Sequence, residues 1–301
     1  MDSVPAHVES LIAASLDCSV SSVEVPADGR IGETYLLELA DTPWQAVCKI
    51  GGPSVRTGDV IEPLATQLVN STTELPVPSV LATGVFDEET GFQKHWAVYE
   101  HREGVTPTPF DARAVSVRRR ILSETGAILG QLHAKHQFDR LGGLGRSADT
   151  LCICDPDGLN FPKRGRELVG ITPTYRDRDR VPVLSHGDLF PGNLLVDKDG
   201  TVTALLDWGN AQVTTASYAL ARAEMRFVDW FQFPAKERKR LRSALRRGYR
   251  QHRPLPAEYP ELASFYKAVW LAQSADRVCR HLLSRRGRQQ MKRHLASLVP
   301  V

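Results

Sequence analysis

Hydrophobic residues alternate over short distances in the first third of this chain. Residues 23–26, 34–39 and 44–50 form short apolar runs, and turn sequences rich in Asp, Gly and Pro separate them. Two further runs of this kind lie near 79–85 and 95–99. Short runs of this length between turn sequences are typical of β-strands. The pattern therefore predicts a five-stranded antiparallel sheet.

Helical spacing of apolar residues appears around and beyond this sheet. Residues 3–17 place apolar side chains on one face, with Ser3 as the expected cap, and residues 63–69 predict a short helix. After Gly104, residues 111–137 carry apolar side chains at helical spacing. We expect a long helix there, because a helix buries one such face along its length.

The remaining part of the chain predicts a loop, a few strands and a set of late helices. Residues 141–180 are rich in Gly, Pro, Asp and Arg without a clear period, which predicts a loop or insertion. Strands are expected at 182–184, 193–197 and 201–207, and helices from 216 to 296. The expected fold class is α+β.

The change in pattern predicts two lobes. An N-terminal lobe with an antiparallel sheet should span residues 1–103, and a mostly helical C-terminal lobe should span 104–301. Hydrophobic residues make up 42% of the 301 residues, enough to bury a substantial core. No stretch reaches the roughly 18 apolar residues that span a bilayer. The scattered cysteines and the lack of a secretory start predict reduced thiols in a cytoplasmic protein.

Charge is distributed unevenly along the sequence. Residues 236–293 hold 17 of the 38 Lys and Arg and 4 of the 35 Asp and Glu, a local balance of +13. The rest of the chain has 21 basic and 31 acidic residues, a balance of −10. The late helices are therefore expected to be strongly basic, either as a solvated face or as a surface that favours anions.

Three polar residues in the segment 185–208 have the spacing that phosphoryl transfer requires. Lys198-Asp199-Gly200 predicts a hairpin turn, which brings Asn193 and Asp207 opposite each other, with Asp188 on the loop before them. A carboxylate can orient an acceptor hydroxyl, and amide and carboxylate oxygens can hold Mg²⁺ beside nucleotide phosphates. We assign the first task to Asp188 and the second to Asn193 and Asp207.

The motifs His186-Gly187-Asp188 and Asp207-Trp208 resemble those of the aminoglycoside phosphotransferase and choline kinase-like family. That family has a bilobal protein-kinase-like fold and uses ATP with Mg²⁺. The resemblance implies that Asp188 is the catalytic base, that Asn193 and Asp207 bind Mg²⁺, and that His186 braces the loop. Family members commonly carry Asp in the following helix, where this chain has Ala219, so another group must support the loop.

The resemblance also implies a nucleotide site in the N-terminal lobe. Lys49 stands where the family places the lysine that contacts the nucleotide phosphates, and Glu62 is its favoured partner, with Asp59 as a rival. Pro63 puts Glu62 at the start of its helix.

Two further segments are expected to contact the nucleotide. Gly29 and Gly32 would belong to the loop that covers the phosphates. Backbone groups of Glu100 and Arg102 would meet the adenine between the lobes.

The expected activity is transfer of the γ-phosphoryl group of ATP to a hydroxyl of a small molecule. Aminoglycosides are polycations, and the basic late helices 236–296 favour a neutral or anionic acceptor instead. Two alternatives stay open. One is an aminoglycoside-type antibiotic kinase, and the other is a module that binds nucleic acid or anions through those helices, without a membrane span.

Overall fold

The computed structural model describes residues 4–26, 33–51, 60–87, 93–153 and 181–273, with residues 284, 285, 288, 289 and 292. The chain forms two compact units. The first unit comprises Met1–Gly104, Gly145–Cys152 and Thr203–Ala211. The second comprises Val105–Leu144, Ile153–Val202 and Gln212–Val301. Nucleotide binding by residues 1–103 and catalysis by residues 104–301 stay predictions.

An antiparallel sheet forms the centre of the first unit, as its short apolar runs predict. Its strands are β1 (Val20–Glu24), β2 (Glu33–Leu39), β3 (Gln45–Ile50), β4 (Val80–Asp87) and β5 (Gln93–Glu100). They lie in the order β1-β2-β3-β5-β4. Along β3, buried Ala46, Cys48 and Ile50 alternate with less buried residues, so one face of the sheet is apolar. The predicted five-stranded sheet is confirmed.

Helix α1 (Ala6–Leu16) covers that apolar face. Val8, Leu11 and Ile12 are buried in one cluster with side chains of β2 and β3. Each such side chain stabilises the fold by about 1.5–3 kcal/mol when fully buried. The predicted Ser3 cap is wrong, because the helix starts after Pro5, which offers no side-chain acceptor, and Ser3 itself lies outside the described residues.

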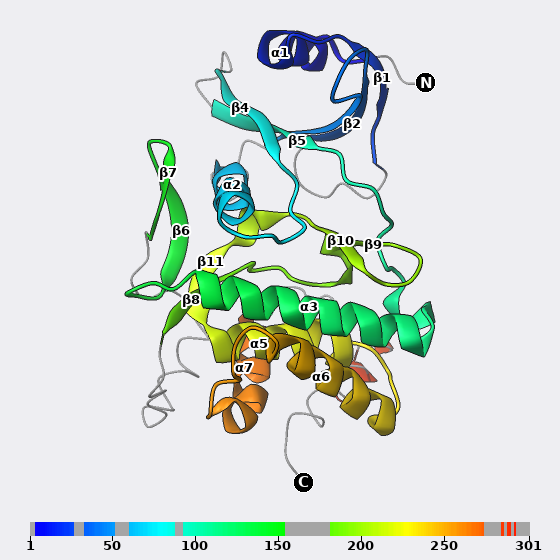
Figure 1. Ribbon diagram of the computed structural model, residues 1–301, viewed down its shortest axis with the longest axis vertical. Helices are drawn as coiled ribbons and strands as arrows, with labels where there is room; N and C mark the ends of the chain where they lie inside the picture. Colours follow the sequence, from blue (N-terminus) through cyan, green and yellow to red (C-terminus); the bar gives the residue numbers. More distant parts are fainter. Residues whose placement is uncertain are drawn as a thin grey trace. The chain divides into compact units, whose positions relative to one another are not determined.

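Helices make up most of the described second unit. Their bounds are α3 (Val115–Lys135), α5 (Ala216–Glu224), α6 (Ala235–Tyr249) and α7 (Tyr259–Gln273). Helices α3 and α6 lie side by side (Figure 1), and they approach closely because Gly126, Gly130 and Gly248 face the backbone of the other helix. A Cβ atom on Gly130 would lie 2.5 Å from the carbonyl oxygen of Tyr249. A π-helical turn, η5 (Met225–Asp229), follows α5 directly.

The predicted loop at 141–180 is wrong in its first part. Strands β6 (Gly142–Ser147) and β7 (Thr150–Ile153) occupy residues 142–153, and residues 154–180 lie outside the described residues. These strands join β8 (Pro182–Ser185) and β11 (Gln212–Thr215) in the order β7-β6-β11-β8. Strand β6 contains three glycines and has no apolar alternation, because backbone pairing to β11 forms it. Such pairing leaves no signal in the local pattern.

Strands β9 (Leu194–Val196) and β10 (Val202–Leu205) form a two-stranded sheet around the predicted turn. Gly200 has a φ of 88°, the left-handed conformation that glycine adopts without strain. Oδ1 of Asp197 accepts hydrogen bonds from the backbone of Asp199 and Thr201 at 2.9 Å each. None of the helices in the described part of the chain is long and apolar enough to cross a membrane.

Candidate active site

The loop after β8 holds Asp188 by hydrogen bonds from its own neighbours. His186 is buried, and its Nδ1 accepts the backbone N–H of Asp188 at 3.2 Å. Nδ2 of Asn193 donates to the carbonyl oxygen of Asp188 at 2.9 Å. The Gly187 N–H points to Oγ of Ser185 at 3.4 Å. These contacts fix the backbone of the loop on both sides of Asp188.

This internal support bears on the missing aspartate of helix α5. Ala219 is buried at the position where an acidic residue was expected, and it offers no side-chain acceptor. The start of α5 is capped by Thr215, whose hydroxyl accepts the N–H of Tyr218 at 3.2 Å. His186 and Asn193 therefore supply hydrogen bonds to the loop from inside it, and they provide part of the support that Ala219 cannot.

Two arginines that the sequence analysis missed lie beside Asp188. Oδ1 of Asp188 is 3.5 Å from Nη2 of Arg222 and 3.3 Å from Nη1 of Arg226. All three side chains are 11–17% exposed. Arg222 is in α5 and Arg226 in η5, four residues apart, so both lie on the same side of the helix. Their spacing places them on one side of the helix, but the sequence gives no signal that this side meets the Asp188 loop.

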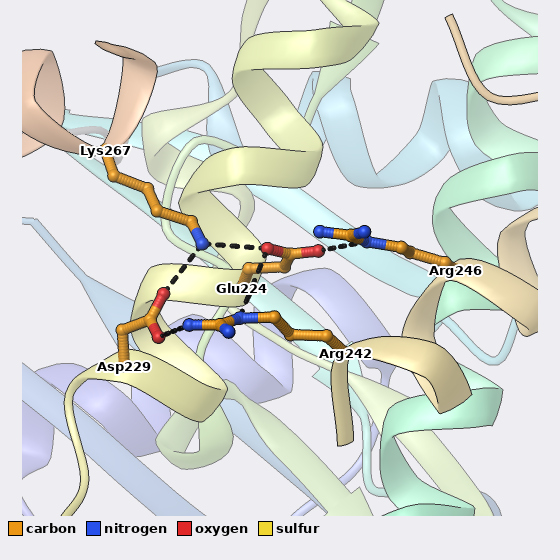
Figure 2. Close-up of polar contacts among 5 residues, drawn as sticks. All are labelled: Glu224, Asp229, Arg242, Arg246 and Lys267. Atoms are coloured by element: carbon orange, nitrogen blue, oxygen red, sulfur yellow. Dashed lines mark hydrogen bonds and ion pairs between the residues drawn. The ribbon is translucent and has the colours of Figure 1, made fainter. Parts of the chain in front are cut away.

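The opposite side of this helix is anchored by a cluster of charges around the buried residues Glu224, Asp229 and Lys267, which Figure 2 shows. Glu224 is fully buried, and its carboxylate accepts from Nε of Arg246 at 2.7 Å and from Nζ of Lys267 at 2.8 Å. Asp229 lies 2.8 Å from the same Lys267 ammonium and pairs with Arg242. The cluster joins α5 and η5 to α6 and α7, so it fixes the segment that carries the two arginines.

Electrostatics keep Glu224 ionised inside this cluster. Burial on its own raises the pKa of a carboxyl group, yet the charges of Lys267 and Arg246 and their hydrogen bonds lower the pKa of Glu224 below its ordinary value of 4.5. The buried carboxylate is thus charged at neutral pH, as its cationic partners require.

The two predicted Mg²⁺ ligands have side-chain oxygens suited to that ion. Asn193 uses its amide nitrogen on the Asp188 carbonyl, which leaves Oδ1 as a ligand. Asp207 has a φ of 64°, uncommon outside glycine, and the next residue, Trp208, is buried with its Nε1 donating to Leu205. Asp207 belongs to the first unit and Asn193 to the second, so their convergence stays a prediction. Within the described residues, no group of three or more His, Cys, Asp and Glu could hold a metal ion.

In the first unit, the structure pairs Lys49 with Glu62. The Lys49 ammonium is 2.6 Å from Oε1 of Glu62, whose side chain is 8% exposed at the first turn of α2 (Glu62–Thr72). Lys49 lies on the less buried face of β3, where Thr34 and Ala97 flank it on the neighbouring strands. The rival Asp59 lies outside the described residues.

The remaining predicted nucleotide contacts are only partly described. Glu100 at the end of β5 donates its backbone N–H to Ser79, and its carboxylate accepts from Nη1 of Arg102 at 3.0 Å. Arg102 also donates to the carbonyl oxygen of Thr203 at 3.3 Å. Gly29 and Gly32 lie outside the described residues. The role of all four in nucleotide binding stays a prediction.

Solved structures that resemble this chain include phosphotransferases of several kinds. A thermostable mutant of aminoglycoside phosphotransferase APH(4)-Ia aligns with a TM-score of 0.58 and 17% identity over 96% of this chain and 98% of its own. The macrolide 2'-phosphotransferase MphH from Brachybacterium faecium aligns with a TM-score of 0.59 and 15% identity over 98% of both chains. A putative fructosamine-3-kinase from Thermobifida fusca aligns with a TM-score of 0.59 and 17% identity, over 95% and 98%.

These likenesses confirm the predicted kinase-like α+β fold. No curated protein matches the sequence significantly. The sequence does match the phosphotransferase enzyme family over residues 22–263, which is most of its length and includes both the Lys49–Glu62 pair and the Asp188 loop. The chain therefore belongs to the phosphotransferase enzyme family.

Proposed function

We propose that this phosphotransferase moves the γ-phosphoryl group of ATP to a hydroxyl of a small molecule that is neutral or anionic. The observation that carries the proposal is the 2.6 Å pair between Lys49 and Glu62. A lysine on this strand, held by a glutamate on the following helix, is the arrangement with which kinases bind nucleotide phosphates. The pair joins residues 13 positions apart, from β3 and from the first turn of α2.

Asp188 would act on the acceptor, and Asn193 and Asp207 on the metal ion. Asp188 accepts a hydrogen bond from the acceptor hydroxyl and takes its proton as the oxygen bonds to the γ-phosphorus and the bond to the ADP oxygen breaks. Asn193 and Asp207 would hold Mg²⁺, which offsets the charge of the phosphates when it is bound. His186 and Asn193 keep the Asp188 backbone in one position for this step.

Relatives of this fold support a nucleotide donor. Aminoglycoside phosphotransferase APH(4)-Ia has been solved with AMP-PNP and hygromycin B, and aminoglycoside 2'-phosphotransferase-IIIa with GDP. The two arginines beside Asp188 disfavour a polycationic acceptor in this chain, because like charges at the acceptor site repel.

The buried cluster weakens the nucleic-acid alternative. Arg242, Arg246 and Lys267 belong to the basic region, yet they face Glu224 and Asp229 rather than an external polyanion.

The test is nucleotide consumption by purified protein against pooled sugars, amino alcohols and antibiotics, with ATP and GTP as donors. Asp188→Asn should lower kcat by about 10²–10⁴, since a general base is lost. Asp207→Ala serves as the blank. Turnover that persists in the Asp188→Asn protein at the wild-type rate would refute the assignment.

A further inference from the structure

The arginine pair Arg222 and Arg226 lies beside the carboxylate of Asp188, the proposed base. One carboxylate faces two guanidinium groups, with its Oδ1 atom 3.5 Å from Nη2 of Arg222 and 3.3 Å from Nη1 of Arg226. Each guanidinium carries five N–H donors in a planar fork. The pair therefore offers Asp188 more donors than one carboxylate can accept.

Arg222 in particular is not saturated. Among the described residues, its Nε is buried and has no hydrogen-bond acceptor. A buried donor of this kind costs free energy until an acceptor reaches it. An oxyanion beside Asp188 would supply that acceptor.

Arg226 is held in position by aromatic rings and by the helix turn that carries it. Its guanidinium carbon lies 4.2 Å from the ring centroid of Phe190 and 5.5 Å from that of Trp270. Phe190 is two residues after Asp188 on the same loop. The π-helical turn presents Arg226 to this loop and Asp229 to the buried cluster of Figure 2. Turns of this kind are frequent at functional sites.

From these contacts we infer that Arg222 and Arg226 form a subsite for an anionic group of the acceptor, a carboxylate or a phosphate, next to the hydroxyl that is phosphorylated. The inference rests on the proposed function for the identity of Asp188 as the base. Planar guanidinium forks bind carboxylate and phosphate in two-point contacts, which would orient the acceptor beside Asp188. The acceptor class is then an alcohol that bears a negative charge.

A binding measurement tests the subsite without catalysis. Sulfate is titrated by calorimetry into the Asp188→Asn protein with a non-hydrolysable ATP analogue present, so that the donor site is filled. We expect sulfate to bind at least about tenfold more tightly than to wild type, because the competing carboxylate charge is gone. Adding both Arg222→Gln and Arg226→Gln should abolish this binding, whereas adding Arg226→Lys alone should keep part of it. Arg240→Gln, at an exposed position of α6, is the control and should leave sulfate binding unchanged. Equal affinity with and without the two arginines overturns the inference.

The arginines could bind either an anionic group of the acceptor or the transferred phosphoryl group, and a kinetic measurement distinguishes the two. Paired alcohols such as glycerol and glycerate, or glucose and glucose 6-phosphate, differ only in the anionic group. Wild type should favour the anionic member by about tenfold or more in kcat/KM, and the double Arg→Gln variant should lose that preference through KM. A fall in kcat for neutral and anionic members alike would assign the arginines to the phosphoryl group and overturn the inference.

The two measurements also separate this inference from the proposed function. If no alcohol is phosphorylated but sulfate binding depends on the arginines, the proposed function fails and the anion subsite stands. If neutral alcohols are phosphorylated with no effect of the arginines, the function stands and the subsite fails.

Discussion

Replacing Glu224 by Gln should strongly destabilise the second unit. The Glu224 side chain is fully buried and accepts two charge-assisted hydrogen bonds, at 2.7 Å from Arg246 and 2.8 Å from Lys267. Each is worth about 1.5–3 kcal/mol, and Gln can replace only one of them, more weakly. Lys267 is then left buried with Asp229 as its described carboxylate partner. Breaking a buried pair in this way costs about 3–5 kcal/mol, so we expect a loss of about 3 kcal/mol or more.

The assay is urea denaturation followed by far-ultraviolet circular dichroism, which reports on the helices. Glu261→Gln, on the exposed first turn of α7, is the matched control and should change the unfolding free energy by at most about 1 kcal/mol. A loss below about 1 kcal/mol for Glu224→Gln, equal to the control, would refute the view that these charges are desolvated and mutually dependent.

The pH dependence of the same variant follows from the lowered pKa of Glu224. A carboxyl group with a lowered folded pKa stabilises the protein above its unfolded pKa and loses that contribution as pH falls through the folded value. The stability difference between wild type and Glu224→Gln should therefore be full at pH 7 and shrink below about pH 4.5, where protonated Glu224 resembles Gln. A difference that stays constant down to pH 3 would contradict this assignment of charge.

Two further predictions concern the packing of α3. Gly130→Ala should lower the free energy of unfolding in urea by about 1–3 kcal/mol, because its Cβ would lie 2.5 Å from the carbonyl oxygen of Tyr249. Ser116→Ala, at an exposed position of the same helix, should change it by at most about 0.5 kcal/mol. Equal effects of the two substitutions would contradict the close approach of α3 and α6. Burial, helped by Arg253, lowers the pKa of His133 from 6.5 to about 3. As the pH falls from 7 to 5, the free energy of unfolding of wild type should therefore decrease by about 2 kcal/mol relative to that of His133→Gln. Parallel profiles of unfolding free energy against pH would contradict the lowered pKa of His133.

The spacing of apolar residues was enough to predict the helices and strands that bury one face of their own. The alternation along β3 and the helical spacing of α3 are visible in the sequence because each element buries one face of its own. Strand β6 was missed, since its glycines gain their conformation from pairing with β11, which lies about 70 positions later. The sequence favoured Glu62 over Asp59 as the partner of Lys49, but only the structure supplies the contact between Lys49 and Glu62.

The same limit applies to the active site. The spacing of Asp188, Asn193 and Asp207 is visible in the sequence because the roles predicted for them depend on a short motif. Arg222 and Arg226 could not be assigned in the same way, since nothing in a helix sequence says which side meets the Asp188 loop. That side is fixed by Glu224 and Asp229, whose partners lie on α6 and α7.

This placement of charge changes the reason for expecting an acceptor that is neutral or anionic rather than cationic. The +13 balance of residues 236–293 omits Glu224 and Asp229, which lie just before that window and face three of its basic residues. Arg118 of α3 likewise pairs with Glu237, inside the window. The basic region therefore serves in part to hold helices together, and its net charge says little about the acceptor. Arg222 and Arg226 lie outside that window and contact Asp188 itself, so the expectation of an anionic acceptor now depends on two residues that substitution can test.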